Sequence, residues 1–207
     1  MELKRARDRP RSERAPRSAM RLVIGAGEIE AVAFDVPVAE FLTETQMARH
    51  PDLSRIGPDF LAEEFDETEA LRRLKGRGDS AIAEVILNQR VVSGVGNEYK
   101  SEVLFLAKVS PFTLVGKLED AELEKIVRTA RRLLQVNVLE SGGHRAVLHR
   151  GPRRTTRSLN PDALRWVYSR QGQSCRECGT MIMMKKQGLD ARVTFWCPAC
   201  QNEGRNG

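Results

Sequence analysis

Residues 175–200 read CRECGTMIMMKKQGLDARVTFWCPAC and contain all four cysteines of the chain. The cysteines form two Cys-x-x-Cys pairs, Cys175/Cys178 and Cys197/Cys200, with eighteen residues between the pairs. Two such pairs can direct four thiolates at one tetrahedral Zn²⁺, so we expect one structural zinc ion. Two disulfides or a redox dithiol are the alternatives. The first is disfavoured because no secretory signal opens the chain, and the second because it needs one pair beside a βαβ unit.

The residues between the two cysteine pairs predict a β-hairpin. Residues 180–184 and 192–196 are two short runs rich in apolar and β-forming side chains, and residues 187–190 lie between them as a turn. A hairpin with one cysteine pair at each outer end is a zinc ribbon. Such a small unit has little core of its own, so the metal would supply most of its folding free energy.

The charge of the chain favours a phosphate-rich partner. The 207 residues include 34 Lys or Arg and 28 Asp or Glu, for a net charge of +6. Residues 1–21 contain eight basic and three acidic side chains, which is typical of a basic arm that is either disordered or in contact with DNA. Hydrophobic residues make up 41% of the chain, and no apolar run is long enough to predict a membrane span.

Residues 20–34 predict a β-hairpin, with strands 21–24 and 29–34 on either side of Gly25-Ala-Gly27. Prolines then mark a loop-rich passage up to about residue 58. Three helices are expected to start at Asp66, with Glu69 completing a capping box, at Asp79, and at Asn97. The clearest amphipathic helix is predicted within 118–138, and its apolar stripe consists of Leu123, Ile126, Val127, Ala130, Leu133 and Leu134.

The turn Gly94-Val-Gly96-Asn97 separates two of these predicted helices. Two glycines allow a sharp turn and a close approach of the backbone to another molecule. A helix that begins at Asn97 would present free N–H groups and the positive end of its dipole, both of which attract phosphate. A plain helix corner, whose glycines serve packing, is the structural alternative.

Four segments together resemble the formamidopyrimidine-DNA glycosylase and endonuclease VIII family, in its endonuclease VIII-like branch. Residues 87–105, LNQRVVSGVGNEYKSEVLF, are similar to the helix-two-turn-helix signature of that family. Residues 56–61, IGPDFL, are similar to the linker that enters the helical domain. Residues 166–179 and 192–201 are similar to the two halves of the C-terminal zinc hairpin.

The resemblance implies base-excision repair of double-stranded DNA that carries an oxidised base or an abasic site. Enzymes of the family flip the damaged base, attack the sugar C1′ with an N-terminal proline amine, and cut the strand by β,δ-elimination. Residue by residue, it implies that Asn97 and the amides around Gly94 and Gly96 hold backbone phosphates. Arg192 would contact the phosphates beside the flipped nucleotide. Gln89 matches a glutamine that we interpret as structural.

Two positions depart from the family pattern. Asn88 stands where the family usually has an acidic residue. The chain opens Met1-Glu2-Leu3-Lys4 instead of Met-Pro-Glu, and its first proline is Pro10. We therefore expect an N-terminally truncated member that lacks the catalytic proline and glutamate, and the sequence leaves open whether the chain is an enzyme.

These inferences give an α+β fold with four parts. We expect a basic arm over 1–20, a remnant of the N-terminal β-sandwich over 21–60, a helix-two-turn-helix domain over 61–145, and a linker with the zinc hairpin over 146–207. The chain would be a cytoplasmic, nucleoid-associated monomer that binds damaged DNA and no membrane. A non-catalytic zinc-containing DNA-binding module is the first alternative. A structural RNA-binding protein is the second, because ribosomal proteins also use a helix-two-turn-helix.

Overall fold

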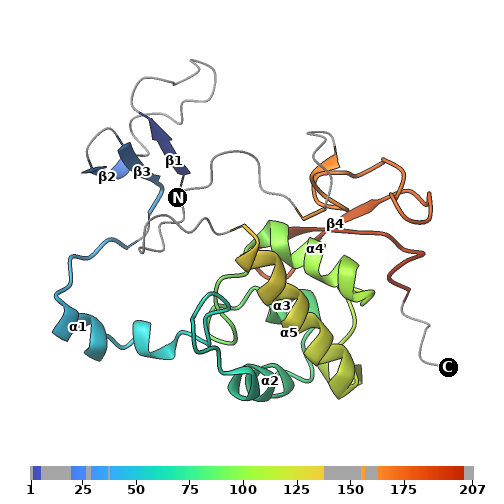
Figure 1. Ribbon diagram of the computed structural model, residues 1–207, viewed down its shortest axis with the longest axis horizontal. Helices are drawn as coiled ribbons and strands as arrows, with labels where there is room; N and C mark the ends of the chain where they lie inside the picture. Colours follow the sequence, from blue (N-terminus) through green and yellow to red (C-terminus); the bar gives the residue numbers. More distant parts are fainter. Residues whose placement is uncertain are drawn as a thin grey trace. The chain divides into compact units, whose positions relative to one another are not determined.

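The computed structural model describes residues 2–5, 20–26, 29–36, 38–137, 155–156 and 163–202 (Figure 1). The chain divides into two compact units, Met1–Leu53 and Ser54–Gly207, which we describe separately. The second unit contains both the helical segment and the C-terminal hairpin with the cysteines. Across the helices of the described residues, none combines the length and apolar character that a membrane crossing requires.

The first unit contains an antiparallel sheet of three strands in the order β1-β3-β2. The predicted hairpin is confirmed: β2 (Met20–Ala26) pairs with β3 (Ile29–Phe34), with a register shift between Met20 and Leu22. The third strand, β1 (Glu2–Arg5), lies within the stretch expected as a basic arm and pairs along the free edge of β3. Pairing with β3 satisfies backbone groups that an isolated arm would leave to water. Residues 6–19, the rest of that arm, lie outside the described residues.

A short helix interrupts the passage that we expected to be loop-rich. Helix α1 (Glu44–Arg49) starts with a complete capping box, in which Thr43 and Gln46 each bond the backbone N–H of the other. A single 3-10 turn, η2 (Leu53–Arg55), follows it. The polar pattern Thr-x-x-Gln is the local signal that predicts this helix start, and we had overlooked it.

In the second unit, helix α2 (Glu67–Lys75) begins where the sequence predicts, but its cap is only half of the expected box. The Asp66 carboxylate accepts the N–H of Glu69 at 2.8 Å. The Glu69 carboxylate instead accepts hydrogen bonds from Arg72 and Arg73, at 2.6–2.7 Å. Two charged donors within one turn of the helix compete successfully for that carboxylate against a single backbone N–H.

Helix α3 (Ile82–Val85) is shorter than predicted and begins three residues after Asp79. The chain before it is held in an extended conformation, because Ala81 forms a β-bridge with Leu114 and the Ile82 N–H donates to the Thr113 carbonyl at 2.9 Å. These partners lie about thirty positions away in the sequence, so the local pattern could not reveal them.

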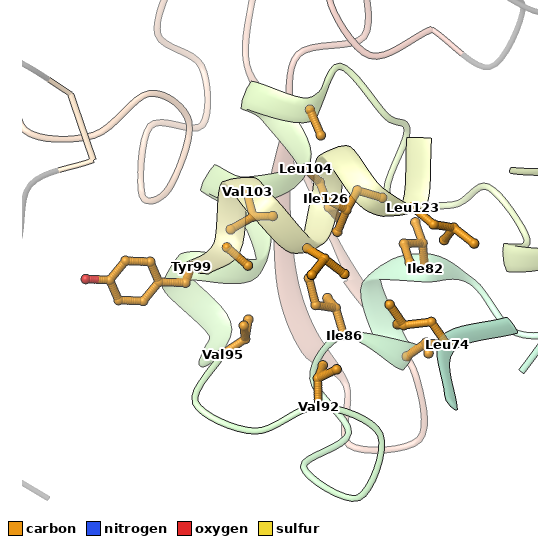
Figure 2. Packing of buried hydrophobic residues seen from close by; sticks show 14 of the residues in the cluster. Leu74, Ile82, Ile86, Val92, Val95, Tyr99, Val103, Leu104, Leu123 and Ile126 are labelled. Carbon is orange, nitrogen blue, oxygen red and sulfur yellow. The ribbon is translucent and has the colours of Figure 1, made fainter. Parts of the chain in front are cut away.

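Helices α4 (Asn97–Ala107) and α5 (Asp120–Gln135) form the centre of the helical core (Figure 1). A 3-10 turn, η3 (Val115–Lys117), precedes α5. Every residue of the predicted apolar stripe of α5 is buried, which confirms the amphipathic helix. Figure 2 shows that stripe packed against α3, α4 and the turn between them, and the labelled residues include Ile82, Ile86, Val92, Val95, Val103, Leu104, Leu123 and Ile126.

The predicted C-terminal hairpin is confirmed, with its first strand displaced towards the turn. Strand β4 (Met183–Gln187) pairs antiparallel with β5 (Arg192–Trp196), in a register that places Met183 opposite Trp196. Gly188 occupies the turn with φ +72°, a conformation that glycine adopts without strain. Strand β5 packs on α4, so this helix is covered by α5 and by the hairpin.

Candidate nucleic-acid interface and metal centre

The turn between α3 and α4 is held open by one glutamine side chain. The Gln89 Nε2 donates to the carbonyls of Leu87 and Val95, each at 3.0 Å, and its Oε1 accepts the N–H of Gly94 at 2.9 Å. Gly94 has φ +101°, which strongly favours glycine. The structure thus gives Gln89 the structural role expected from the sequence, because it fixes the path of the backbone into α4.

The N-terminus of α4 is free of side-chain caps. Gly96 is the N-cap, one position before Asn97, which we predicted as the cap and which is the first helical residue. A Cβ added at Gly96 would meet nothing within 4 Å, so the backbone faces open space there. The Asn97 Oδ1 is buried and has no hydrogen-bond partner among the described residues. The first turn of the helix therefore offers N–H donors and an amide group to a ligand.

Arg192 lies on the hairpin at the first position of β5 and its side chain is 63% exposed. Its Nε is 3.9 Å from the Asp190 carboxylate, which is a loose surface pair. Arg192 borders a cavity of about 500 Å³ between the hairpin tip and α3, together with Asn88, Gln89 and Lys100. Asn97, Gly94 and Gly96 are not among the lining residues, so the structure places the predicted DNA contacts on α4 and on the hairpin without joining them in one cavity.

The four cysteines converge as predicted. All four are free, and their Sγ atoms lie within 4.8 Å of one another. The Sγ–Sγ distances are 3.9 Å between Cys175 and Cys200 and 3.4 Å between Cys178 and Cys197. Tetrahedral coordination with metal–sulfur bonds of about 2.3 Å separates the sulfurs by about 3.8 Å. The group is therefore of the right size to hold one metal ion.

The environment of the thiols differs from one cysteine to the next. Hydrogen bonds from Thr180 lower the pKa of Cys178 to about 6, whereas burial raises the pKa of Cys197 and of Cys200. Buried thiols bind a cation as thiolates only if the metal compensates for the loss of hydration. A bound cation would satisfy that requirement for the whole group.

A second apolar cluster, distinct from the helical core, surrounds the cysteines. Phe105 of α4 is fully buried in it, beside Val167 and Ile182, and stacks on Trp166 with ring centroids 5.6 Å apart. The hairpin is therefore fixed to the helical core by α4 itself. This contact fixes the metal centre to the C-terminal half of that helix.

Two charged residues of α4 are buried, and sequence reasoning did not single them out. Lys100 reaches the backbone of β5, and Glu102 accepts three backbone N–H groups, from Trp166, Val167 and Tyr168, each at 2.8 Å. The sequence carries no local signal for their burial, because Asn97 and Glu98 also make the first half of the helix polar. Their partners are more than sixty residues away in the sequence.

The comparisons with known proteins all match one family of DNA repair enzymes. Residues 56–147 match the family model described as "Formamidopyrimidine-DNA glycosylase H2TH domain". The chain is 33% identical over 188 residues to "Probable endonuclease 8 2" of Streptomyces coelicolor, which covers 90% of this chain and 63% of that protein. It is also 33% identical to "DNA-(apurinic or apyrimidinic site) lyase Nei2" of Mycolicibacterium smegmatis, over 88% of this chain and 66% of that one. The chain thus spans somewhat less than two thirds of these relatives.

Among solved structures, the chain is similar to Lactococcus lactis Fpg in complex with DNA that contains an abasic site. The TM-score is 0.69 at 26% sequence identity, over 97% of this chain and 70% of that protein. The likeness therefore includes the N-terminal sheet as well as the helices and the C-terminal hairpin.

Proposed function

Since this chain belongs to the family of formamidopyrimidine-DNA glycosylases and endonuclease VIII, we propose that it binds duplex DNA with an oxidised base or an abasic site. The observation that carries the proposal is the open turn at Gly94–Asn97, where Gln89 holds the backbone and no side chain caps the first N–H groups of α4. A free helix N-terminus and an exposed arginine each suit the phosphate backbone of DNA. The partner would be the bacterial chromosome, as the sequence predicted.

Phosphate recognition follows from the chemistry of the donors. The Asn97 side-chain N–H and the backbone N–H groups after Gly96 can donate to phosphate oxygens without moving a cap out of the way. Arg192 can donate two parallel hydrogen bonds, and its only described ion pair, with Asp190, is weak enough to exchange for a phosphate. These contacts would fix the duplex in position and would not read the base sequence.

We propose that the four cysteines bind one Zn²⁺ with a structural role. The sulfur set supports it, because four thiolates fill a tetrahedral shell and leave no position for water or substrate. Bound zinc would supply a cross-link between the two ends of the hairpin. It would thereby hold β5, which begins at Arg192, in its position against α4.

We infer further that the β1-β3-β2 sheet corresponds to part of the N-terminal β-sandwich of the family. The antiparallel order of its strands supports this, as does the structural likeness to Lactococcus lactis Fpg over 97% of the chain. In the family, the sandwich domain supplies the proline amine that attacks C1′. The sequence does not match that feature at Met1-Glu2, and Met1 lies outside the described residues.

Two functions remain distinct on this basis: a glycosylase and AP lyase, and a binding module without chemistry. The family signatures quoted above lie within residues 56–201 and support DNA binding, which both functions share. Borohydride trapping on a duplex with one abasic site separates the two. A covalent adduct indicates a Schiff base and therefore lyase chemistry, whereas noncovalent binding without an adduct indicates the module.

Binding itself is tested by fluorescence anisotropy on abasic and undamaged duplexes at several salt concentrations. We expect Asn97→Ala and Arg192→Ala to weaken binding, and Arg192→Ala to reduce the slope of log K against log salt by about 0.9. Lys125→Ala, which removes an exposed charge from α5, is the matched control. Wild-type affinity retained in both site variants would refute the proposed interface, and a preference for structured RNA over both duplexes would revive the RNA-binding alternative.

A further inference from the structure

Lys100 is a lysine buried in the interior of the protein, between α4 and the hairpin. Its exposed fraction is 1%, so it cannot touch DNA directly. The Nζ donates to the Val193 carbonyl at 3.0 Å and to the Thr194 Oγ1 at 2.7 Å. Burial of an ammonium group is costly unless its donors are satisfied, so this position needs an explanation.

The position of Lys100 in the chain suggests what it does. It lies one helical turn after Asn97 on α4, and the two groups that it bonds directly follow Arg192 on β5. Thr194 is fully buried, and its hydroxyl donates a hydrogen bond to the Gln187 Oε1 at 3.1 Å. One side chain therefore links the start of α4 to both strands of the hairpin at the level of Arg192.

Lys100 also faces the cavity that Arg192 borders. The charged groups around it are Glu84 on α3, Arg77 after α2, and Asp190 and Arg192 on the hairpin. Burial, followed by the charge of Arg192, lowers the pKa of Lys100 to about 8, and Glu84 opposes the change. Near neutral pH the ammonium form therefore still prevails, and it adds positive charge behind Arg192.

We propose that Lys100 is a positioning residue that fixes Arg192 relative to the N-terminus of α4. Arg192 and the N–H groups at the start of α4 would then bind the phosphate backbone of the same DNA duplex. The inference rests on the proposed function, because it concerns the same phosphate contacts. A lysine that served packing alone would stabilise the fold and would have no energetic coupling to Arg192.

The test is a double-mutant cycle on the full chain loaded with zinc. The variants are Lys100→Met, Arg192→Ala and the double variant, with Lys125→Met as a control that removes an exposed lysine of α5. Affinity for a duplex with one abasic site is measured by anisotropy between pH 6.5 and 9.5, and zinc content is measured for every protein. We expect Lys100→Met to weaken binding roughly tenfold at pH 7, and the double variant to be no weaker than Arg192→Ala within about twofold.

The pH profile provides a readout that loss of packing would not change. A phosphate near Arg192 favours the protonated Lys100, so wild-type affinity should fall as the pH rises through about 8. The Lys100→Met variant should lose that fall, and Lys125→Met should keep it. Thr194→Val removes an acceptor of Lys100 and keeps the ammonium, so it should weaken binding while the pH dependence persists.

Several outcomes would overturn the inference. Wild-type affinity and pH profile in Lys100→Met would do so, as would independent, multiplicative effects of Lys100→Met and Arg192→Ala. If the Lys100→Met protein contains no zinc, the affinity of Thr194→Val for the abasic duplex becomes the deciding measurement. Unchanged affinity in that variant would reject the proposed link between Lys100 and Arg192. If the wild-type chain binds neither duplex, the proposed function fails and this inference fails with it; if it binds and Arg192→Ala weakens it, only the role of Lys100 is in question.

Discussion

Replacement of Glu102 by glutamine should destabilise the junction between α4 and the segment before the first cysteine pair. The Glu102 Oε1 accepts the N–H groups of Val167 and Tyr168, and its Oε2 accepts the N–H of Trp166 and the hydroxyl of Thr155. The carboxylate is fully buried. Every acceptor position that faces the protein is thus in use, and one of the two oxygens becomes a donor in glutamine.

The expected loss of stability in Glu102→Gln follows from the number of hydrogen bonds that the glutamine amide cannot accept. In its better orientation, glutamine keeps its oxygen on Val167 and Tyr168 and turns its NH₂ towards Trp166 and Thr155. The Thr155 hydroxyl can rotate to accept, but the Trp166 N–H is left without a partner, at a cost of about 1–3 kcal/mol. The two retained bonds also lose their charge assistance, while a neutral amide is less costly to bury. We expect a net loss of about 2 kcal/mol.

Urea unfolding followed by tryptophan fluorescence measures this loss, because the only two tryptophans are Trp166 and Trp196, and one precedes each cysteine pair in the sequence. With a slope of about 2 kcal/mol per molar urea, the midpoint should shift by about 1 M. Glu124→Gln is the matched control, because Glu124 pairs with Arg128 at 3.1 Å on the exposed face of α5 and should shift the midpoint by less than about 0.25 M. Equal midpoints for the two variants would refute the reasoning.

Three further changes have expected outcomes. Gly57→Ala places a Cβ 2.3 Å from the Val91 carbonyl oxygen, so thermal unfolding should show a loss of about 3 kcal/mol in the free energy of unfolding. Gly25→Ala is the control: its Cβ meets nothing within 4 Å, and its free energy of unfolding should stay within about 0.5 kcal/mol of the wild type. Similar melting of both variants would contradict the packing argument. Cys197→Ser should make the residues after position 170 sensitive to protease and, because the hairpin covers α4, should also destabilise the helices; a protected hairpin would disprove dependence on the metal. Hydrogen bonds from two arginines of α2 lower the pKa of Glu69 from 4.5 to about 2, so the stabilisation from its carboxylate is complete above pH 4.5 and is lost as the pH falls towards 2. In Glu69→Gln, the urea midpoint should therefore fall less steeply with acidification than in the wild type. Identical declines in the two proteins would contradict this.

The sequence predicted those features whose signal is local. The apolar stripe of α5, the hairpin over residues 20–34 and the convergence of the four cysteines each depend on spacing that can be read along the chain, and the structure confirms all three. The resemblance to the DNA glycosylase family, carried by the turn and the zinc hairpin, is also confirmed. The predicted roles of Asn97 and Arg192 remain predictions.

The features that escaped prediction depend on distant partners. Helix α3 starts late because Thr113 and Leu114 hold the chain before it. The burial of Lys100 and Glu102 depends on groups 53 to 94 positions away. A lysine or glutamate within a helix is normally a solvent-facing residue, and only the tertiary fold reveals that these two are inside.

Helix α4 has no side left for solvent along most of its length, because neighbouring residues enter different clusters. Val103 and Leu104 enter the helical cluster, whereas Phe105 enters the one around the cysteines. A protein fragment cut after α5 would leave Phe105, Lys100 and Glu102 uncovered, and a fragment that begins near position 163 would lose the helix on which its hairpin rests. The smallest piece that we expect to be expressed as a stable, soluble protein is therefore the whole of residues 54–202, and gene fragments designed at the apparent linker should fail on both sides of the cut.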